Sequence, residues 1–485
     1  MEIMNGVAAV DFEFARQMLQ RGIAVLFILG FLSTLNQFRP LAGERGLLPA
    51  PDLLLRAREI EHERGQKMLR PTLFRWAGYT DRRLALVCWA GTTVAFLLVA
   101  GVPQLGPPWV PMLCFLALWY GYMSVTSIGR TFYGFGWEML LCEAGFLAAF
   151  LGSNSQPPTT VTIVLMMWLV FRLEFGAGMI KVRGGREWRD LTALMYHHET
   201  QPMPGPLSRT AHLMPSWFHR GEVVGNHVTQ LGLTWLLFVP LLSLAIDSPW
   251  PLLVGAGTAA VVIVTQLWLV VTGNFAWLNW ATIVLVFSAV GIPGSGSADA
   301  DIPIYWVVVT SAVFILYVIL SWPAARNLFS RNQVMNGSFN RWQLANAYGA
   351  FGTVTTTRTE YVIEGSADGV TWQEYGFRGK PGDVHRRPPQ IAPYHLRLDW
   401  MMWFLPLGGI DRWFIVLLHR LLEADAPTLK LLAHDPFHAA RPTAVRVVSY
   451  RYRFSTRDEF TATGDRWVRD RRSVLIPPMT RGSLY

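Results

Sequence analysis

Long apolar segments separated by short polar ones fill the first two thirds of the chain. A helix needs about 20 mostly apolar residues to cross a bilayer. Nine segments approach or reach this length: 22–38, 84–102, 110–128, 136–151, 160–181, 227–246, 252–272, 275–292 and 304–322. Unpaired backbone groups are costly in lipid, so helices are the expected form of these segments. The pattern predicts a mainly α-helical polytopic membrane protein with about eight or nine transmembrane helices over residues 1–322.

Two longer polar loops, 39–83 and 182–222, interrupt the apolar pattern. The first contains ten basic residues, whereas the short polar segment 294–301 contains none. Because Lys and Arg are enriched in cytoplasmic loops, this distribution places both long loops on the cytoplasmic side. With nine spans, the part of the chain after residue 322 falls on that side as well.

After residue 322 the pattern changes to shorter runs with strand and helix character. Residues 360–366 are rich in β-forming types, Asp368 and Gly369 supply a tight turn, and 371–377 is the expected returning strand. A helical, aromatic section follows at 397–422, and another strand is expected at 444–455. We therefore predict a soluble C-terminal domain over 323–485, β-rich and β-sandwich-like, with helices.

The aromatic residues of the C-terminal section have two possible roles. They fit either the core of the predicted domain or a patch that contacts the membrane interface. The residues concerned are Trp400, Trp403, Phe404, Trp413 and Phe414.

Composition and charge narrow the possible functions. The chain is 52% hydrophobic with a mean hydropathy of +0.28, which excludes a single soluble domain. Its net charge is +9, and the residues after Trp322 contribute +8 of it, from 22 basic and 14 acidic side chains. This excess suits anionic lipid headgroups or an acidic partner. The charge comes with no nucleic-acid-binding motif, so we expect no nucleic-acid partner.

Five charged residues lie within apolar segments: Glu138, Glu143, Arg172, Glu174 and Lys181. Each costs about 2.5–3.5 kcal/mol or more in lipid, so such residues are candidates for a function. Glu174 and Lys181 share one helix face, while Arg172 points elsewhere and could reach Glu143. The charges fit either a structural ion-pair network or a substrate site.

The second polar loop contains a group of residues that can bind metals: His197, His198, Glu199 and His212. The HExxH spacing of zinc proteases is absent, and adjacent histidines on a helix usually point apart. We therefore expect a structured polar loop and no metal site. The sequence has no GxSxG elbow or glycine-rich phosphate loop, and its three cysteines lie in apolar segments. Neither a catalytic residue nor a cofactor is predicted.

Several motifs, in order along most of the chain, resemble the lipase maturation factor family. They include 135–148 (FGWEMLLCEAGFLA), 171–181 (FRLEFGAGMIK), 204–208 (PGPLS) and 380–383 (KPGD). The similarity is densest within 346–404, where it covers 364–366, Asp368, Gly369 and 397–400 among others. Six residues of this stretch are candidates for a client-binding surface: Trp372, Tyr375, Arg397, Asp399, Trp400 and Trp403.

The resemblance implies a membrane-bound, chaperone-like factor that helps secreted lipase-like clients mature. It also implies a C-terminal domain facing the lumen, opposite to the charge distribution. The location would be the endoplasmic reticulum membrane in eukaryotes. The Arg-rich composition, with 38 Arg against four Lys, suggests a bacterium, where the location would be the plasma membrane.

Two alternatives involve the intramembrane charges. Residues 177–181 and Trp188 also resemble a segment of the vitamin K-dependent γ-carboxylase, in which the matching lysine is implicated as a base. A buried lysine can act as a base. The resulting alternative is a polytopic membrane enzyme that acts on a lipid or quinone-like substrate with Lys181 as base. A transporter that uses the intramembrane charges is a third hypothesis.

Overall fold

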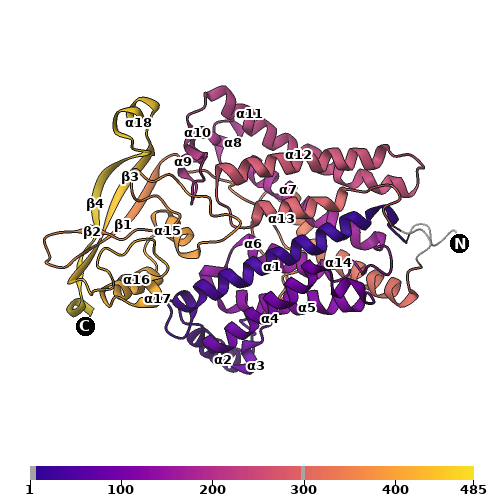
Figure 1. Ribbon diagram of the computed structural model, residues 1–485, viewed down its shortest axis with the longest axis horizontal. Coiled ribbons are helices and arrows are strands. Elements are labelled where there is room, and N and C mark those ends of the chain that lie inside the picture. The colour runs from indigo at the N-terminus through magenta and orange to yellow at the C-terminus, as the bar shows by residue number, and fades with distance from the viewer. Residues whose placement is uncertain (1–6, 297–300, 485) are drawn as a thin grey trace.

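The computed structural model describes residues 7–296 and 301–484. Figure 1 shows a bundle of long helices and, at one end of it, a C-terminal region built around a twisted sheet. The bundle contains α1 (Glu13–Ala42), α4 (Asp81–Ala100), α5 (Trp109–Ile128), α6 (Gly136–Ala148), α7 (Thr160–Arg183), α11 (Ser216–His227), α12 (Trp250–Thr272), α13 (Leu278–Val286) and α14 (Ile304–Phe329). Short helices occupy the two polar loops: α2 (Ala50–Arg64), α3 (Phe74–Ala77), α8 (Arg186–Arg189), α9 (Leu194–Thr200) and α10 (Ser208–His212).

All nine predicted apolar segments are helical. Within the described ranges, seven helices are long and apolar enough to cross a membrane, and α11 reaches this length by continuing to Leu244. The other two segments contain α6 and α13, which are shorter. Every residue of α6 is buried among the surrounding helices. An apolar segment of this length can equally be a buried core helix, so seven of the nine segments qualify as spans by length among the described residues, and the predicted mainly helical membrane fold is confirmed.

The segment after α11 departs from regular α-helix. It passes through one π-helical turn at Val228–Gly232 and a 3-10 helix at Leu233–Leu244, which contains Pro240. Proline has no backbone N–H to donate, so it cannot take part in a regular helical hydrogen-bond ladder. Departures of this kind often mark functional positions in helices.

Over its described residues, the C-terminal region contains one antiparallel sheet of four strands in the order β2-β1-β3-β4. The strands are β1 (Arg358–Ser366), β2 (Gln373–Glu374), β3 (Ala444–Phe454) and β4 (Trp467–Thr480). The predicted hairpin is present: β1 pairs with β2, and Gly369 has a φ of 78° in the turn. Asp368 Oδ1 stabilises this turn by accepting hydrogen bonds from the backbone N–H groups of Val370 and Thr371 at 2.8 and 2.7 Å.

Helices rather than a second sheet cover the β-sheet. The C-terminal helices are α15 (Arg397–Gly408), α16 (Arg412–Leu422), α17 (Ala426–Leu429) and α18 (Arg457–Thr463). Helix α15 packs against β1, and α16 packs against β3. Trp413, Phe414, Leu417, Leu418 and Leu421 of α16 are all buried. The expectation of a β-sandwich is therefore corrected to a single sheet covered by helices.

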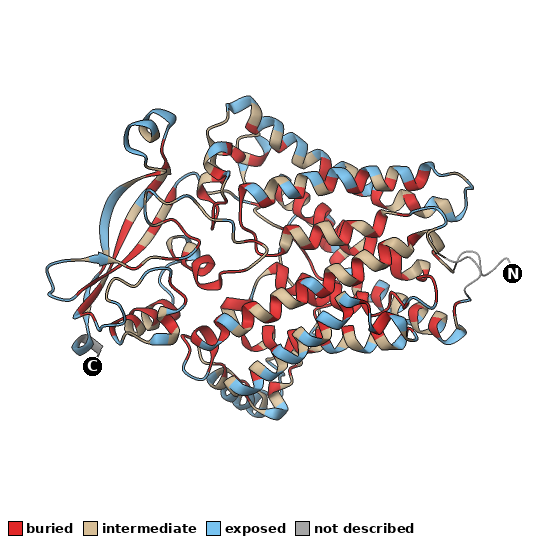
Figure 2. Cartoon of the chain, in the orientation of Figure 1, coloured by how far each residue is buried: buried red, intermediate tan, exposed pale blue. Residues whose placement is uncertain are grey.

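The sheet stands at the end of the bundle that carries both long polar loops. Arg420 of α16 donates to the carbonyl oxygen of Arg45 at 2.9 Å, and Arg358 of β1 donates to that of Glu199 at 2.8 Å. The described start of the chain lies at the opposite end (Figure 1), where Asp11 accepts from the backbone of Gly294. Figure 2 shows the buried residues continuing from the middle of the bundle to its junction with the C-terminal region.

Candidate functional site

Glu143 on α6 and Arg172 on α7 form a buried ion pair inside the bundle. Asn346, in the segment that leads to β1, completes the arrangement. The backbone N–H of Asn346 donates to Glu143 Oε2 at 3.0 Å, and Asn346 Nδ2 donates to the same oxygen at 2.7 Å. Arg172 donates to the carbonyl oxygen of Asn346 at 2.8 Å. The hydroxyls of Tyr317 and Tyr348 also donate to Glu143. We call Glu143, Arg172 and Asn346 the first anchor, because they fix the chain after α14 to two helices.

Two glycines of α7 and the loop after it allow this segment to lie directly against the helix. A Cβ at Gly176 would collide with the carbonyl oxygen of Tyr348, and one at Gly184 would collide with that of Gly352. Gly185 then donates to the carbonyl oxygen of Gly352 at 2.7 Å. No local pattern in the sequence indicates that this extended segment docks on α7.

A second buried ion pair joins Glu138 of α6 to Arg397, the first residue of α15. Arg397 also donates to the carbonyl oxygen of Phe132 at 2.9 Å, and its guanidinium lies 3.6 Å from the centre of the Tyr133 ring. Burial alone would lower the pKa of Arg397, but the carboxylate of Glu138 holds it above its usual value. We call Glu138 and Arg397 the second anchor, because they tie α15 to α6.

His395 lies beside the second anchor among aromatic rings. Its ring centre is 5.0 Å from that of Trp137 and 5.2 Å from that of Phe135. The side chain is fully buried, and burial lowers its pKa to about 4. His395 is thus neutral in the folded protein at pH 7.

This burial predicts acid sensitivity. The ordinary pKa of histidine is about 6.5, so the unfolded chain binds a proton at His395 below this pH, while the folded chain does not until about pH 4. The free energy of unfolding is therefore highest above pH 6.5 and falls as the pH is lowered. At pH 5, the loss due to His395 is about 2 kcal/mol. Thermal unfolding of wild type and His395→Phe at pH 7 and pH 5 measures the difference. We expect the unfolding midpoint to fall less between pH 7 and pH 5 in the variant than in wild type. An equal decrease would contradict a neutral, buried His395. The exposed change His385→Gln is the control.

The other intramembrane charges, Glu174 and Lys181, lie in a network of neutral amides. Lys181 Nζ donates to Asn226 Oδ1 at 2.9 Å and to Gln230 Oε1 at 3.0 Å, and it lies 4.9 Å from the centre of the Trp188 ring. Glu174 Oε1 accepts a hydrogen bond from Gln266 Nε2 at 2.8 Å. Hydrogen-bonding partners of this kind satisfy buried charges and link α7 to the neighbouring helices.

The four candidate residues of the second polar loop point in different directions. His197 stacks on Phe275, and burial lowers its pKa to about 3. His198 faces Glu222 instead. Glu199 and His212 contact each other at 3.3 Å, and burial raises the pKa of Glu199 while lowering that of His212 to about 4. The four therefore do not converge on one site.

Glu199 also connects the loop to the sheet. Its Oε2 accepts the backbone N–H of Phe454 in β3 at 2.8 Å. On the same loop, the carbonyl oxygen of Thr200 accepts a hydrogen bond from Trp403 Nε1 at 2.8 Å. Helix α9 thus forms part of the bundle surface that contacts the C-terminal region.

Four of the six candidates for a client-binding surface are buried in the chain. Arg397 is in the second anchor, and Tyr375 and Trp400 pack in the hydrophobic core. Asp399 accepts the backbone N–H groups of Gly379 and Lys380 at 2.6 and 3.2 Å, and burial raises its pKa. These four side chains are buried and hold the fold together, so the surface that they were expected to provide lies in this structure at the two remaining candidates.

The remaining two candidates, Trp372 and Trp403, are partly exposed. Trp372 lies on the sheet, with the guanidinium of Arg446 4.0 Å from its ring centre. Trp403 lies on the wall of a groove of about 420 Å³ between the end of α15 and residues 354–359. Leu407, also in the groove wall, is 51% exposed, and Phe404 and Ile410 are exposed nearby. In the sequence, Leu407 is distinguished only as an apolar residue in an expected helix.

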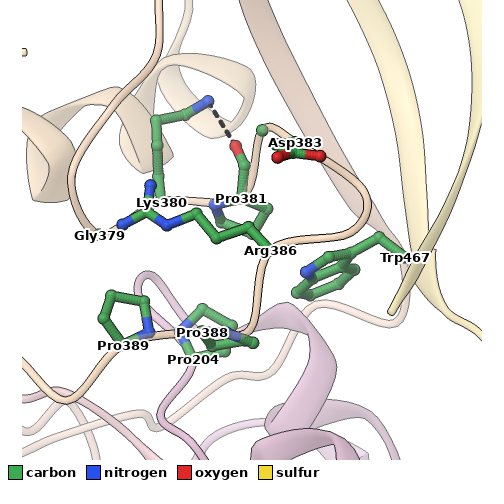
Figure 3. Close-up of a pocket in the computed structure, with 10 residues that line it drawn as sticks. Pro204, Gly379, Lys380, Pro381, Asp383, Arg386, Pro388, Pro389 and Trp467 are labelled. Atoms are coloured by element: carbon green, nitrogen blue, oxygen red, sulfur yellow. Dashed lines mark hydrogen bonds between the residues drawn. The ribbon is translucent and has the colours of Figure 1, made fainter. Parts of the chain in front are cut away.

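A second, narrow recess lies between the sheet and the bundle loops (Figure 3). Pro204, Lys380, Pro381, Pro389 and Trp467 are among the residues that line it. The Arg386 side chain lies in the recess and donates to the carbonyl oxygen of Phe377 at 2.6 Å. The recess holds only about 10 Å³, so the side chains that line it pack closely, and Lys380, Pro381 and Asp383 of the KPGD motif take part in this packing.

Comparison with known proteins assigns the family. Residues 14–291 match the lipase maturation factor transmembrane domain, and residues 344–477 match the lipase maturation factor C-terminal domain. The chain belongs to the lipase maturation factor family. The family resemblance of the sequence is thereby confirmed, and so is the expected multi-pass membrane protein.

Individual relatives cover almost the whole chain. Lipase maturation factor 1 of Homo sapiens is 37% identical over 97% of this chain and 88% of its own length. The Mus musculus protein of the same name is 34% identical over 96% of this chain and 87% of its own length. Lipase maturation factor 2 of Homo sapiens is 27% identical over 96% of this chain and 83% of its own length. No solved structure matches significantly. Both anchors join a residue of the transmembrane match to a residue of the C-terminal match.

Proposed function

We propose that this protein is a membrane-bound, chaperone-like maturation factor that binds an exported lipase-like client and carries out no bond chemistry of its own. The observation that carries the proposal is the 37% identity to a human lipase maturation factor along nearly the whole chain. In this proposal, residues 1–322 form the membrane unit in contact with lipids, and residues 323–485 form the client-binding domain.

The groove beside α15 is the proposed client-binding surface. It combines the exposed apolar side chain of Leu407 and the partly exposed Trp403 with polar residues 355–357, all threonines. Strand β2 pairs only with Glu364 and Gly365 of β1, so the first half of β1, which enters the groove, extends beyond β2. An extended client segment could dock along such a strand while apolar side chains fill the groove.

Site-specific photo-crosslinking tests the proposal. A photoreactive amino acid replaces Leu407 in the full-length protein, which is expressed with a secreted lipase, and crosslinked products are identified by immunoblotting. We expect a lipase adduct from position 407 and none from position 461, an exposed threonine on α18 that serves as the control. Equal labelling from both positions, or none from 407, would contradict client binding at the groove.

The non-enzymatic role predicts that Lys181 is dispensable for maturation itself. Lys181→Met keeps the length of the side chain but leaves Asn226 and Gln230 without their donor, so we expect lower stability, by about 1–3 kcal/mol. The yield of active lipase per folded molecule should stay within about twofold of wild type. Loss of all maturation by a well-folded variant would favour the enzyme hypothesis instead.

Binding an exported client requires the C-terminal region on the lumenal or periplasmic face. The membrane would be the endoplasmic reticulum membrane in a eukaryote or the plasma membrane in a bacterium. The ten basic residues of 39–83 lie at the same end as the C-terminal region and favour the opposite orientation. Alkaline phosphatase fused after residue 485 should be active, because this enzyme folds only outside the cytoplasm. If that fusion is inactive and a reporter that works only in the cytoplasm is active at the same position, exported clients are excluded.

A further inference from the structure

Three side chains that bind metals converge where α9 meets α11. His219 and Glu222 are three residues apart and therefore share one face of α11. His198 reaches them from α9, and the candidate ligand atoms of the three residues all lie within 4.8 Å of one another. Both histidines are only 2% exposed. The cluster is separate from both anchors and from the groove.

The spacing fits a small divalent ion. His198 Nε2 lies 3.3 Å from the Glu222 carboxylate, and His219 Nδ1 lies 3.0 Å from Glu222 Oε2. Around a tetrahedral zinc ion with bonds of about 2.0–2.1 Å, neighbouring ligand atoms stand about 3.3 Å apart. The three side chains therefore need only small movements to share one ion.

The hydrogen bonds around the cluster orient its ligands. His219 Nε2 lies 3.3 Å from the carbonyl oxygen of His212, which can only accept, so Nε2 carries the hydrogen. His219 Nδ1 faces a carboxylate oxygen of Glu222, and either a hydrogen on Nδ1 or a metal ion bound by both atoms makes this contact favourable. Trp268 Nε1 donates to Glu222 Oε1 at 2.6 Å and holds the carboxylate in place. Metal ligands typically have partners of this kind.

We propose that His198, His219 and Glu222 bind one Zn²⁺ ion that links α9 to α11. Two histidines and one glutamate are a known zinc ligand set, with solvent in the fourth position. Helix α9 also carries Glu199 and Thr200, which contact β3 and Trp403 of the C-terminal region. The ion would thus stabilise the position of α9, which contacts the C-terminal region next to the groove. This proposal does not depend on the client-binding role.

Zinc binding by the purified full-length protein in detergent tests the proposal. After dialysis against a chelator, Zn²⁺ is added in competition with a chromogenic chelator, and bound metal is counted by mass spectrometry. We expect one ion per chain in wild type and in the control His62→Asn, an exposed histidine of α2. His219→Asn and Glu222→Gln should each weaken binding more than a hundredfold. Trp268→Phe, which removes only a supporting hydrogen bond, should weaken it about 10- to 100-fold.

Wild-type protein loaded with Co²⁺ provides a readout that does not depend on the folding of any variant. Intense visible absorption bands are expected from a low-symmetry nitrogen and oxygen site, and added Zn²⁺ should remove them. Binding of less than one ion per chain, or equal binding by wild type and Glu222→Gln, would overturn the proposal. In that case the contacts among the three side chains are structural and hold no metal.

Discussion

Arg397→Met should be among the most destabilising single changes in the chain. The substitution leaves the fully buried Glu138 carboxylate without its positive partner. Breaking a buried ion pair from one side typically costs about 3–5 kcal/mol, a large share of the stability of an ordinary domain. We expect α15 to detach from α6. Faster proteolytic cleavage near residue 397 and a lower thermal unfolding midpoint would both reveal this change.

A double variant separates the ion pair from simple loss of packing. Glu138→Met combined with Arg397→Met replaces both charges by apolar groups, which is often nearly neutral in proteins. We therefore expect the double variant to be more stable than Arg397→Met alone. The surface change Arg186→Met, which breaks the exposed ion pair with Asp190, serves as the matched control and should cost less than about 1 kcal/mol. Additive losses in the double variant would show that the two charges do not depend on each other.

Leu407→Asp should abolish most client maturation without unfolding the protein. Leu407 is half exposed in the groove wall, so a carboxylate there remains solvated and costs little stability. An apolar client side chain that docks against it would instead meet a charge. Central contacts of an interface often contribute about 2 kcal/mol, a factor of roughly 30 in affinity. Secreted lipase activity per folded molecule measures the loss.

Val370→Asp is the matched control for this experiment. Val370 is 81% exposed at the tip of the β1–β2 hairpin, outside the groove. The same chemical change there should leave the secreted lipase activity at the wild-type level. If both variants fail equally, added negative charge on the C-terminal region is the cause and the groove is not the binding surface.

The sequence predicted the bundle well because helices in lipid must be apolar along their whole length. It also suggested that Arg172 could reach Glu143, and the two form an ion pair. It could not identify the partner of Glu138, because Arg397 lies 259 residues further along the chain. Long-range pairs of this kind depend on how the C-terminal region docks, which no local pattern contains. The proximity of His198 to His219 and Glu222 was not predicted for the same reason, since the last two lie on a different helix from His198.

The family motifs were harder to interpret than to find. Trp400 and Asp399 stand out in the sequence as aromatic and charged residues in a dense motif, which is also what an exposed binding surface looks like. In the structure, Asp399 caps the backbone at Gly379 and Lys380, and Trp400 packs against Trp137. Burial depends on the packing of α15 against the bundle, so the sequence alone could not separate an anchor from a surface.

Refolding of a denatured lipase by the purified protein in lipid nanodiscs tests the central claim most directly, because it requires neither a cofactor nor a cell. The account predicts that wild type and Lys181→Met raise the yield of active lipase per folded molecule to a similar level, while Leu407→Asp does not. A fully active Leu407→Asp together with an inactive, well-folded Lys181→Met would contradict it.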